Sequence, residues 1–159
     1  MNGFDQAAAA LALAGVVCRA AQPVFQQIAR DPTRAFIATL RPRPDDYPKV
    51  FIEGATEVAR AAYDVLWSRT PDVALPSASQ SDIRCVASPA GMLADDNDLS
   101  HGFPGAYRRI ARYLEPHRVW LCWRYVAPGE SSGLAYDGLV WCDDHWAWFP
   151  KPWRALGDR

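Results

Sequence analysis

The sequence predicts an α+β fold in which N-terminal helices pack on a curved antiparallel sheet of about four strands. Apolar residues follow helical spacing in the first part of the chain, and aromatic and branched residues form strand-like runs in the last forty residues. A Pro-, Ser- and Ala-rich loop at residues 71–80 separates the two patterns. We therefore expect one domain, residues 1–159, with a mainly helical half at 1–70 and a mainly sheet half at 81–153.

The N-terminal segment predicts a long amphipathic helix that begins near Asp5 and is kinked or restarted at Pro23. Its apolar stripe consists of Leu13, Val17, Ala20 and Val24. The apolar run at residues 7–18 lacks the basic flank of a secretory signal. With about twelve residues it is also too short to span a bilayer. We expect a buried, Ala-rich helix.

Two further helices are predicted in the first half. Asp31 and Pro32 form a helix-start signal for residues 35–40, and three prolines make residues 41–48 a non-helical connector. Residues 53–69 return to helical spacing. The expected buried face of that helix consists of Val58, Ala62, Val65 and Leu66.

The sheet half begins with a short half-buried strand at residues 81–88, followed by an exposed acidic loop at residues 95–98. A helix at about residues 104–114 comes next, because apolar side chains share one face there. These side chains are Phe103, Tyr107, Ile110, Ala111 and Leu114.

The aromatic-rich C-terminal part predicts a hairpin of residues 119–126 and 134–148 around the turn cluster at 128–133. A second turn at Asp143 and Asp144 gives a third strand. In this register Trp141 lies opposite Trp146 and Leu139 opposite Trp148. Extended backwards, the register places Leu121 beside Leu139, Cys122 opposite Gly138 and Trp123 beside Asp137, so that three strands share one aromatic wall. In shape, a long helix across such a sheet resembles the cystatin-like and NTF2-like cone, which implies no function.

Charge and cysteine usage narrow the function classes. Seventeen basic and eighteen acidic residues give a net charge of −1, which disfavours binding to nucleic acid or an anionic membrane. The four cysteines, at positions 18, 85, 122 and 142, do not have the spacing of a disulfide framework. We expect a cytoplasmic protein with four reduced, buried thiols.

No motif in the sequence indicates a cofactor or a metal. Cys142 and His145 have a C-x-x-H spacing, but zinc needs three or four protein ligands. In the predicted register Cys122 lies roughly 13 Å along the strand from Cys142. Unless a loop brings His101 or His117 to the pair, it is only the end of a hairpin. A nucleophile elbow, a dinucleotide-binding loop and a Walker loop are all missing.

Asp137 is the most unusual polar position, because the register places a carboxylate on the aromatic wall. A buried carboxylate is expected to accept hydrogen bonds from a neighbouring side chain and to stabilise the packing. The alternative is an acid or base of raised pKa in a pocket.

The leading hypothesis is a non-enzymatic binding protein whose partner is a protein or a small apolar ligand. Six of the seven tryptophans lie in the last forty residues, and binding surfaces are enriched in Trp, Tyr and Arg. The Pro-Lys-Pro-Trp segment at 150–153 either covers the core or faces the partner. The candidate binding residues are Trp123, Arg124, Tyr136, Trp141, Trp146, Trp148 and Trp153.

Two other hypotheses belong to different classes. The first is a small cofactor-free enzyme that uses Asp137 with His145, His101 or Tyr125 as acid and base. A core without a cavity larger than ~300 Å³ would exclude it. The second is a homodimer formed through the sheet.

Overall fold

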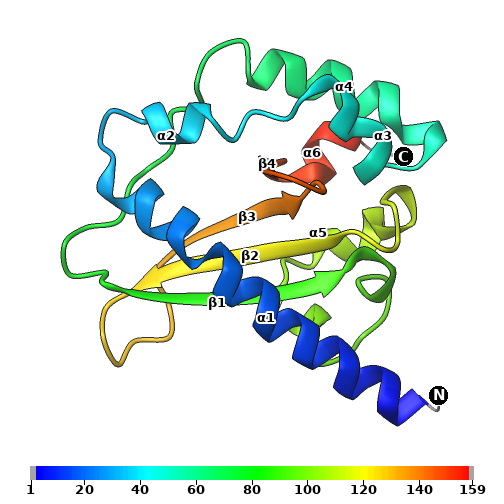
Figure 1. Cartoon of the computed structure of the whole chain (residues 1–159), viewed down its shortest axis with the longest axis horizontal. Coiled ribbons are helices and arrows are strands. Elements are labelled where there is room, and N and C mark those ends of the chain that lie inside the picture. The colour runs from blue at the N-terminus through cyan, green and yellow to red at the C-terminus, as the bar shows by residue number, and fades with distance from the viewer. Residues whose placement is uncertain (1–2, 158–159) are drawn as a thin grey trace.

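The computed structural model describes residues 3–157 and confirms the predicted α+β fold class: helices pack on a four-stranded antiparallel sheet (Figure 1). The strands follow one another in the order β1-β2-β3-β4. They are β1 (Asp82–Pro89), β2 (Val119–Val126), β3 (Leu134–Trp141) and β4 (Trp146–Trp148). Each strand pairs with the next along the chain. Residues 127–133 connect β2 to β3, and residues 142–145 connect β3 to β4.

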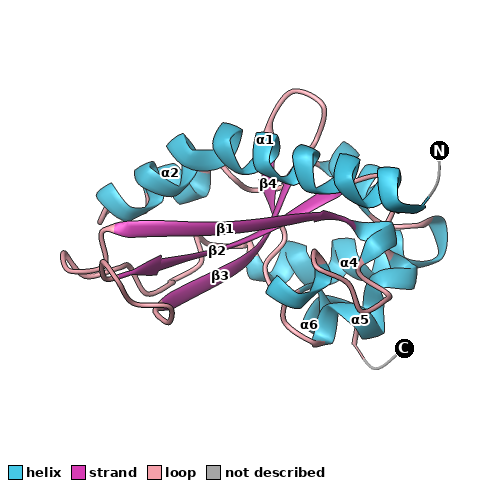
Figure 2. Ribbon diagram, turned by 90° about the horizontal axis from the view of Figure 1, so that it is seen from below, coloured by secondary structure: helices cyan, strands magenta, loops and turns pink. Residues whose placement is uncertain are grey.

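Helices cover both faces of the sheet. The long helix α1 crosses one face, and α5 and α6 lie on the other side (Figure 2). The helices are α1 (Gly3–Arg30), α2 (Ala35–Ala38), α3 (Tyr47–Val50), α4 (Glu53–Leu66), α5 (Ala106–Ile110) and α6 (Pro152–Leu156). Short 3-10 turns follow α5 at Ala111–Tyr113 and precede α3 at Pro44–Asp46. The prediction that residues 41–48 are non-helical is therefore wrong from residue 44 onwards, because the prolines there occupy the first positions of short helices, where no N–H donor is needed.

Helix α1 continues through Pro23 without a restart, which excludes one of the two predicted alternatives. Pro23 is exposed, so the carbonyl that loses its helical donor lies on the solvent side of the helix and water can satisfy it. The residues that anchor the helix to the sheet are Ala21, Val24, Phe25 and Ile28, all of them buried. Phe25 stacks on Trp123 at a ring separation of 4.6 Å.

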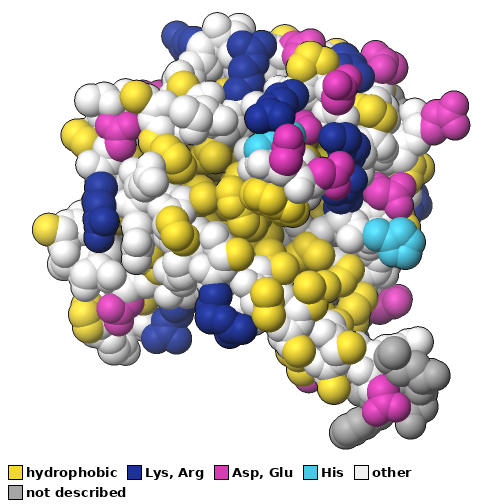
Figure 3. Space-filling model, in the orientation of Figure 1, with side chains coloured by type: hydrophobic (Ala, Val, Ile, Leu, Met, Phe, Trp, Pro, Cys, Tyr) yellow, Lys and Arg dark blue, Asp and Glu magenta, His cyan; other side chains and the backbone are white. Residues whose placement is uncertain are grey.

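The expectation of a buried helix is wrong for the N-terminal half of α1. Leu11, Leu13 and Val16 are 43–55% exposed, and hydrophobic side chains are visible across this face of the molecule (Figure 3). The reason is length: 28 helical residues extend about 42 Å, whereas the eight residues of β1 extend about 26 Å. By length and composition alone, residues Asp5–Arg30 could cross a membrane, as could many soluble core helices and signal sequences.

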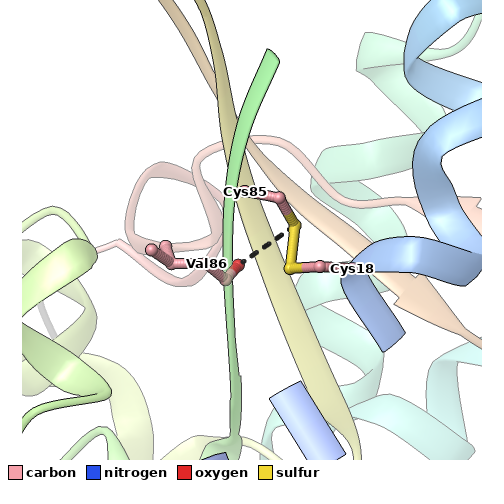
Figure 4. The surroundings of a disulfide bond; sticks show 3 residues. All are labelled: Cys18, Cys85 and Val86. Carbon is pink, nitrogen blue, oxygen red and sulfur yellow. Dashed lines mark hydrogen bonds between the residues drawn. A yellow bond between two sulfur atoms is a disulfide. The ribbon is translucent and has the colours of Figure 1, made fainter. Parts of the chain in front are cut away.

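The prediction of four free thiols is also wrong. Cys18 of α1 and Cys85 of β1 form a disulfide, with their Cα atoms 5.8 Å apart (Figure 4). Cys122 and Cys142 are free and buried, as expected. The disulfide joins the middle of α1, just after its exposed N-terminal half, to the first strand, across 67 residues of sequence.

The other helices agree with prediction to different degrees. The predicted buried side chains around α5 are all buried. In α4 the predicted face is wrong, because Val65 and Leu66 are 75% and 39% exposed. The helix instead directs Ala55, Ala59 and Tyr63 towards the core. This face packs against the C-terminal segment, and the Tyr63 hydroxyl donates a hydrogen bond to the Pro150 carbonyl (3.0 Å).

The predicted strand register is correct near the β3–β4 turn and wrong in the first half of β3, before Gly138. Trp141 pairs with Trp146 and Leu139 with Trp148, as predicted. A bulge then shifts the β2–β3 register, so Cys122 lies opposite Asp137 in place of Gly138. Gly138 has φ +96°, and a Cβ there would overlap the Phe149 carbonyl. Only glycine suits both the left-handed conformation and the close approach of that carbonyl.

Candidate ligand-binding site around Asp137

Two cavities meet at Asp137. The sheet cavity, about 580 Å³, lies on the sheet face opposite α1, under the loop before α5 and the segment before α6. The edge cavity, about 780 Å³, lies between the edge of β3, the end of α4 and α6. Both are lined by residues 135–137 and Lys151. Both volumes lie in the range of small-molecule sites.

The bulge determines which face of the sheet carries Asp137. Residues paired across neighbouring strands share a face, so Asp137 lies on the Cys122 side and Tyr136 on the Trp123 side. The predicted position of Asp137 beside Trp123 is therefore wrong. Its carboxylate instead faces the sheet cavity and the elements that cover it.

The Asp137 carboxylate is a hydrogen-bond acceptor that connects three elements. Its Oδ2 accepts from the Tyr107 hydroxyl of α5 at 2.6 Å and from the Lys151 backbone N–H at 3.0 Å. The Asp137 backbone carbonyl accepts from Trp148 Nε1 at 2.7 Å. Lys151 has a left-handed backbone with φ +49°, so this bond also stabilises an unfavourable conformation just before α6.

Burial raises the pKa of Asp137, because a charged carboxylate loses its hydration there. The Tyr107 hydroxyl, the Lys151 backbone N–H and the positive charges of Lys151 and Arg154 lower the pKa in part. Burial likewise raises the pKa of Tyr107 well above its ordinary value. Tyr107 therefore acts as a donor to Asp137 over the physiological pH range.

Two arginines lie side by side on the sheet face that lines the sheet cavity. Arg84 of β1 and Arg124 of β2 are direct cross-strand partners, and both line the cavity. Their guanidinium groups bond only backbone carbonyls, those of Glu130 (3.2 Å) and Ser131 (3.0 Å). Within residues 3–157 neither arginine has an ion-pair partner. Like charges in directly opposite positions destabilise a sheet, and here both guanidinium groups bond carbonyls of the loop that follows β2.

The predicted acid and base partners of Asp137 are mostly elsewhere. The Tyr125 hydroxyl is buried under α1, where it donates to the Phe25 carbonyl at 2.6 Å. His145 lies at the β3–β4 turn and contacts Asp46. His101 does line the sheet cavity, but its ring pairs with the Asp96 carboxylate.

The predicted aromatic residues divide into three groups. Trp123 and Trp148 are almost completely buried core residues whose rings pack together. Trp141 and Trp146 contact each other at the turn end of the sheet, and Trp141 is 41% exposed. Trp153 lines the sheet cavity and touches Tyr107. Tyr136 lines both cavities and Arg124, which pairs with Ala135, lines the sheet cavity.

Sequence reasoning missed three residues of interest: Tyr107, Arg84 and Asp46. Tyr107 was predicted only as a core residue, because its partner Asp137 lies 30 positions away. The cross-strand position of Arg84 depends on the β1–β2 register, for which the sequence contains no turn signal. Asp46 lies in the proline-rich connector, 99 positions from His145.

Among the residues that the structure describes, one group of His, Cys and carboxylate side chains is close enough to share a metal ion. It consists of Asp46, Cys142 and His145, whose donor atoms all lie within 4.8 Å of one another. The sequence suggested only His101 or His117 as additional ligands for the Cys142 and His145 pair. The structure supplies Asp46 in their place.

No protein-family model, curated protein or solved structure shows a significant match to this chain. The analogy with a cystatin-like or NTF2-like cone therefore gains no support from these comparisons.

Proposed function

We propose that the protein binds a small molecule that combines an apolar body with an anionic group, and that the sheet cavity is its site. The observation that supports this most strongly is the pair of neighbouring arginines, Arg84 and Arg124, at the wall of a cavity of about 580 Å³. An anion bound by both guanidinium groups would accept charge-assisted hydrogen bonds and offset the repulsion between the two positive charges.

The rest of the cavity provides the apolar contacts. Val86, Phe103 and Trp153 line it together with the arginines. Trp153 belongs to the Pro-Lys-Pro-Trp segment, which the Asp137 bond to Lys151 holds against the sheet. Of the residues that the sequence singled out for binding, Trp123, Arg124, Tyr136 and Trp153 line this cavity, whereas Trp141, Trp146 and Trp148 do not. The ring of Trp123 contributes little to the cavity, because it stacks on Phe25 of α1.

The test uses two fluorescent probes that differ in charge. 8-Anilinonaphthalene-1-sulfonate carries a sulfonate, and N-phenyl-1-naphthylamine has a similar aromatic body without one. We expect the sulfonate probe to bind with one-to-one stoichiometry and at least about tenfold more tightly, equivalent to about 1.4 kcal/mol. Equal affinity for the two probes would contradict the anionic part of the proposal.

Variants locate the probe. Arg84→Gln and Arg124→Gln should each lower the affinity for the sulfonate probe about fivefold to tenfold. The affinity for the neutral probe should not change, since only the anion contacts the guanidinium groups. Arg109→Gln is the matched control, because Arg109 is exposed and lies outside the cavity. If all three variants bind the sulfonate probe like the wild type, the site is wrong.

An enzyme is the second candidate, because the sheet cavity exceeds the ~300 Å³ below which we would have excluded one. Asp137, with its raised pKa, would be the acid or base. Asp137 Oδ2 accepts hydrogen bonds from both the Tyr107 hydroxyl and the Lys151 backbone N–H, which favours a structural role for the carboxylate. The stability of Asp137 variants distinguishes the two roles, since a working acid or base is usually dispensable for folding.

Partner and location stay predictions. Trp141 is the exposed aromatic residue at the sheet end that a protein partner or a second copy would cover. The expected cytoplasmic location was argued partly from reduced cysteines, and the Cys18–Cys85 disulfide is more typical of an oxidising compartment.

A further inference from the structure

A second site lies away from both cavities, where the β3–β4 turn meets the turn that precedes α3. Cys142 and His145 flank the β3–β4 turn, and Asp46 ends the neighbouring 3-10 turn. Their donor atoms lie within 4.8 Å of one another. We propose that Asp46, Cys142 and His145 bind a zinc ion. This site is independent of the proposed ligand site.

The Asp46 carboxylate is the first argument, because it is completely buried but only partly bonded. Its Oδ2 accepts from the Arg43 backbone N–H at 2.7 Å and lies 2.8 Å from His145 Nε2. Its Oδ1 is buried without a hydrogen-bond partner. An unsatisfied buried carboxylate oxygen is costly and needs a compensating interaction. A cation beside the Cys142 thiol would provide one.

The donor set is the second argument. Thiolate sulfur, imidazole nitrogen and carboxylate oxygen are the three ligand types that zinc takes from proteins. Three protein ligands leave one tetrahedral position for water or another molecule. Atoms bound to one tetrahedral zinc at ~2.0–2.3 Å lie about 3.3–3.7 Å apart. Small side-chain rotations would therefore suffice to bring the three donors into place.

The surroundings of His145 are the third argument. Its Nδ1 lies 2.5 Å from the Asp144 carboxylate, and this carboxylate–histidine pair is the arrangement that orients metal-binding imidazoles. The turn itself is held by Arg118, which bonds the Asp143 carboxylate at 2.7 Å, and by Lys49 at 3.3 Å. These contacts stabilise Asp143 in its left-handed conformation, φ +68°, and so position the residues on both sides of it.

Charge balance permits zinc despite the neighbouring cations. The group supplies the Asp46 carboxylate and the Cys142 thiol together with the His145 imidazole. Zinc would form bonds to S, N and O, and the thiol proton would leave to solvent as the Zn–S bond forms. The carboxylate and the thiolate then balance the two positive charges of the ion.

The test is a zinc titration of the full chain with its disulfide intact, in competition with a chromophoric chelator. We expect one equivalent of zinc to bind with Kd below about 1 µM and to release the thiol proton of Cys142 at pH 7, read with an indicator in weak buffer. Cobalt in place of zinc should give a thiolate charge-transfer band. Failure to bind one equivalent, or a cobalt spectrum without that band, would overturn the proposal.

Variants assign the ligands. Cys142→Ala and His145→Gln should each lower the affinity for zinc at least about 100-fold. Cys122→Ala and His101→Gln should bind zinc like the wild type. Asp144→Asn keeps the test decisive if the buried variants unfold, because Asp144 is 72% exposed. It should weaken zinc 10- to 100-fold without changing the near-UV circular dichroism. Unchanged affinity in Asp144→Asn or in a folded Cys142→Ala would refute the site.

Discussion

The Cys18–Cys85 disulfide should account for a large share of the stability of this protein. A disulfide restricts the unfolded chain, and the restriction increases with the length of the loop that it closes. The two cysteines are 67 residues apart. In the chain-entropy treatment a loop of this length gives about 4 kcal/mol at 25 °C. Reduction, or the double variant Cys18→Ser/Cys85→Ser, should lower the free energy of unfolding by about that amount.

The loss should be largest in one part of the fold. Leu11, Leu13 and Val16 are exposed, so little apolar packing retains the N-terminal half of α1 once the disulfide is broken. The C-terminal half keeps the stacking of Phe25 on Trp123. Hydrogen exchange of the reduced protein should therefore show loss of protection before residue 18 and retained protection near residue 25.

Urea unfolding followed by circular dichroism, with and without reductant, measures the effect. Cys122→Ala is the control, because it removes a free thiol and its response to reductant should match that of the wild type. Labelling of the denatured chain with iodoacetamide should modify two thiols before reduction and four after it. An unfolding midpoint that reductant does not change, or four thiols labelled without reduction, would refute the disulfide.

The remaining predictions concern the bulge in β3. Asp137→Ala should cost about 1–3 kcal/mol in urea unfolding, because it leaves the buried Tyr107 hydroxyl without its acceptor; an equally or more stable alanine variant would favour the enzyme hypothesis. Because burial raises the folded-state pKa of Asp137, the folded protein holds this proton more tightly than the unfolded chain. Wild-type stability relative to Asp137→Asn should therefore fall as the pH rises above about 3.8 through the folded-state pKa, and a difference that does not vary with pH would contradict the burial argument. Gly138→Ala should cost more than about 2 kcal/mol, because the added Cβ meets the Phe149 carbonyl at positive φ. Gly129→Ala, also at positive φ but with no atom within 4 Å, should cost only about 1 kcal/mol, and equal costs would refute the steric explanation.

The parts of the fold that could be predicted from the sequence are those that local physics determines. The turn residues at 128–133 and Asp143 define the ends of β3 and β4, and the observed pairing of Trp141 with Trp146 follows from that turn. The buried face around α5 follows from helical spacing. In α4 helical spacing predicted the wrong buried face. The C-terminal segment packs against the face of Ala55 and Tyr63, so these side chains are buried and Val65 is exposed.

The candidate sites depend on long-range contacts, which local patterns do not contain. Asp46 meets His145 across 99 positions, and the disulfide spans 67. Neither the spacing of the cysteines nor the composition of the connector indicates these partners. One local signal was available: an isolated glycine inside a strand pattern suggests a bulge, and Gly138 was such a residue.

That glycine connects the fold to the proposed function. Without the bulge, strict alternation would place Asp137 beside Trp123, on the face covered by α1. With one extra residue in β3, Asp137 lies opposite Cys122 and on the same face as Arg84 and Arg124. The carboxylate can then hold Lys151 and the segment that carries Trp153 over the sheet cavity. The bulge thus places the Asp137 carboxylate at the cavity that the arginine pair already lines, which is the arrangement that the binding proposal requires.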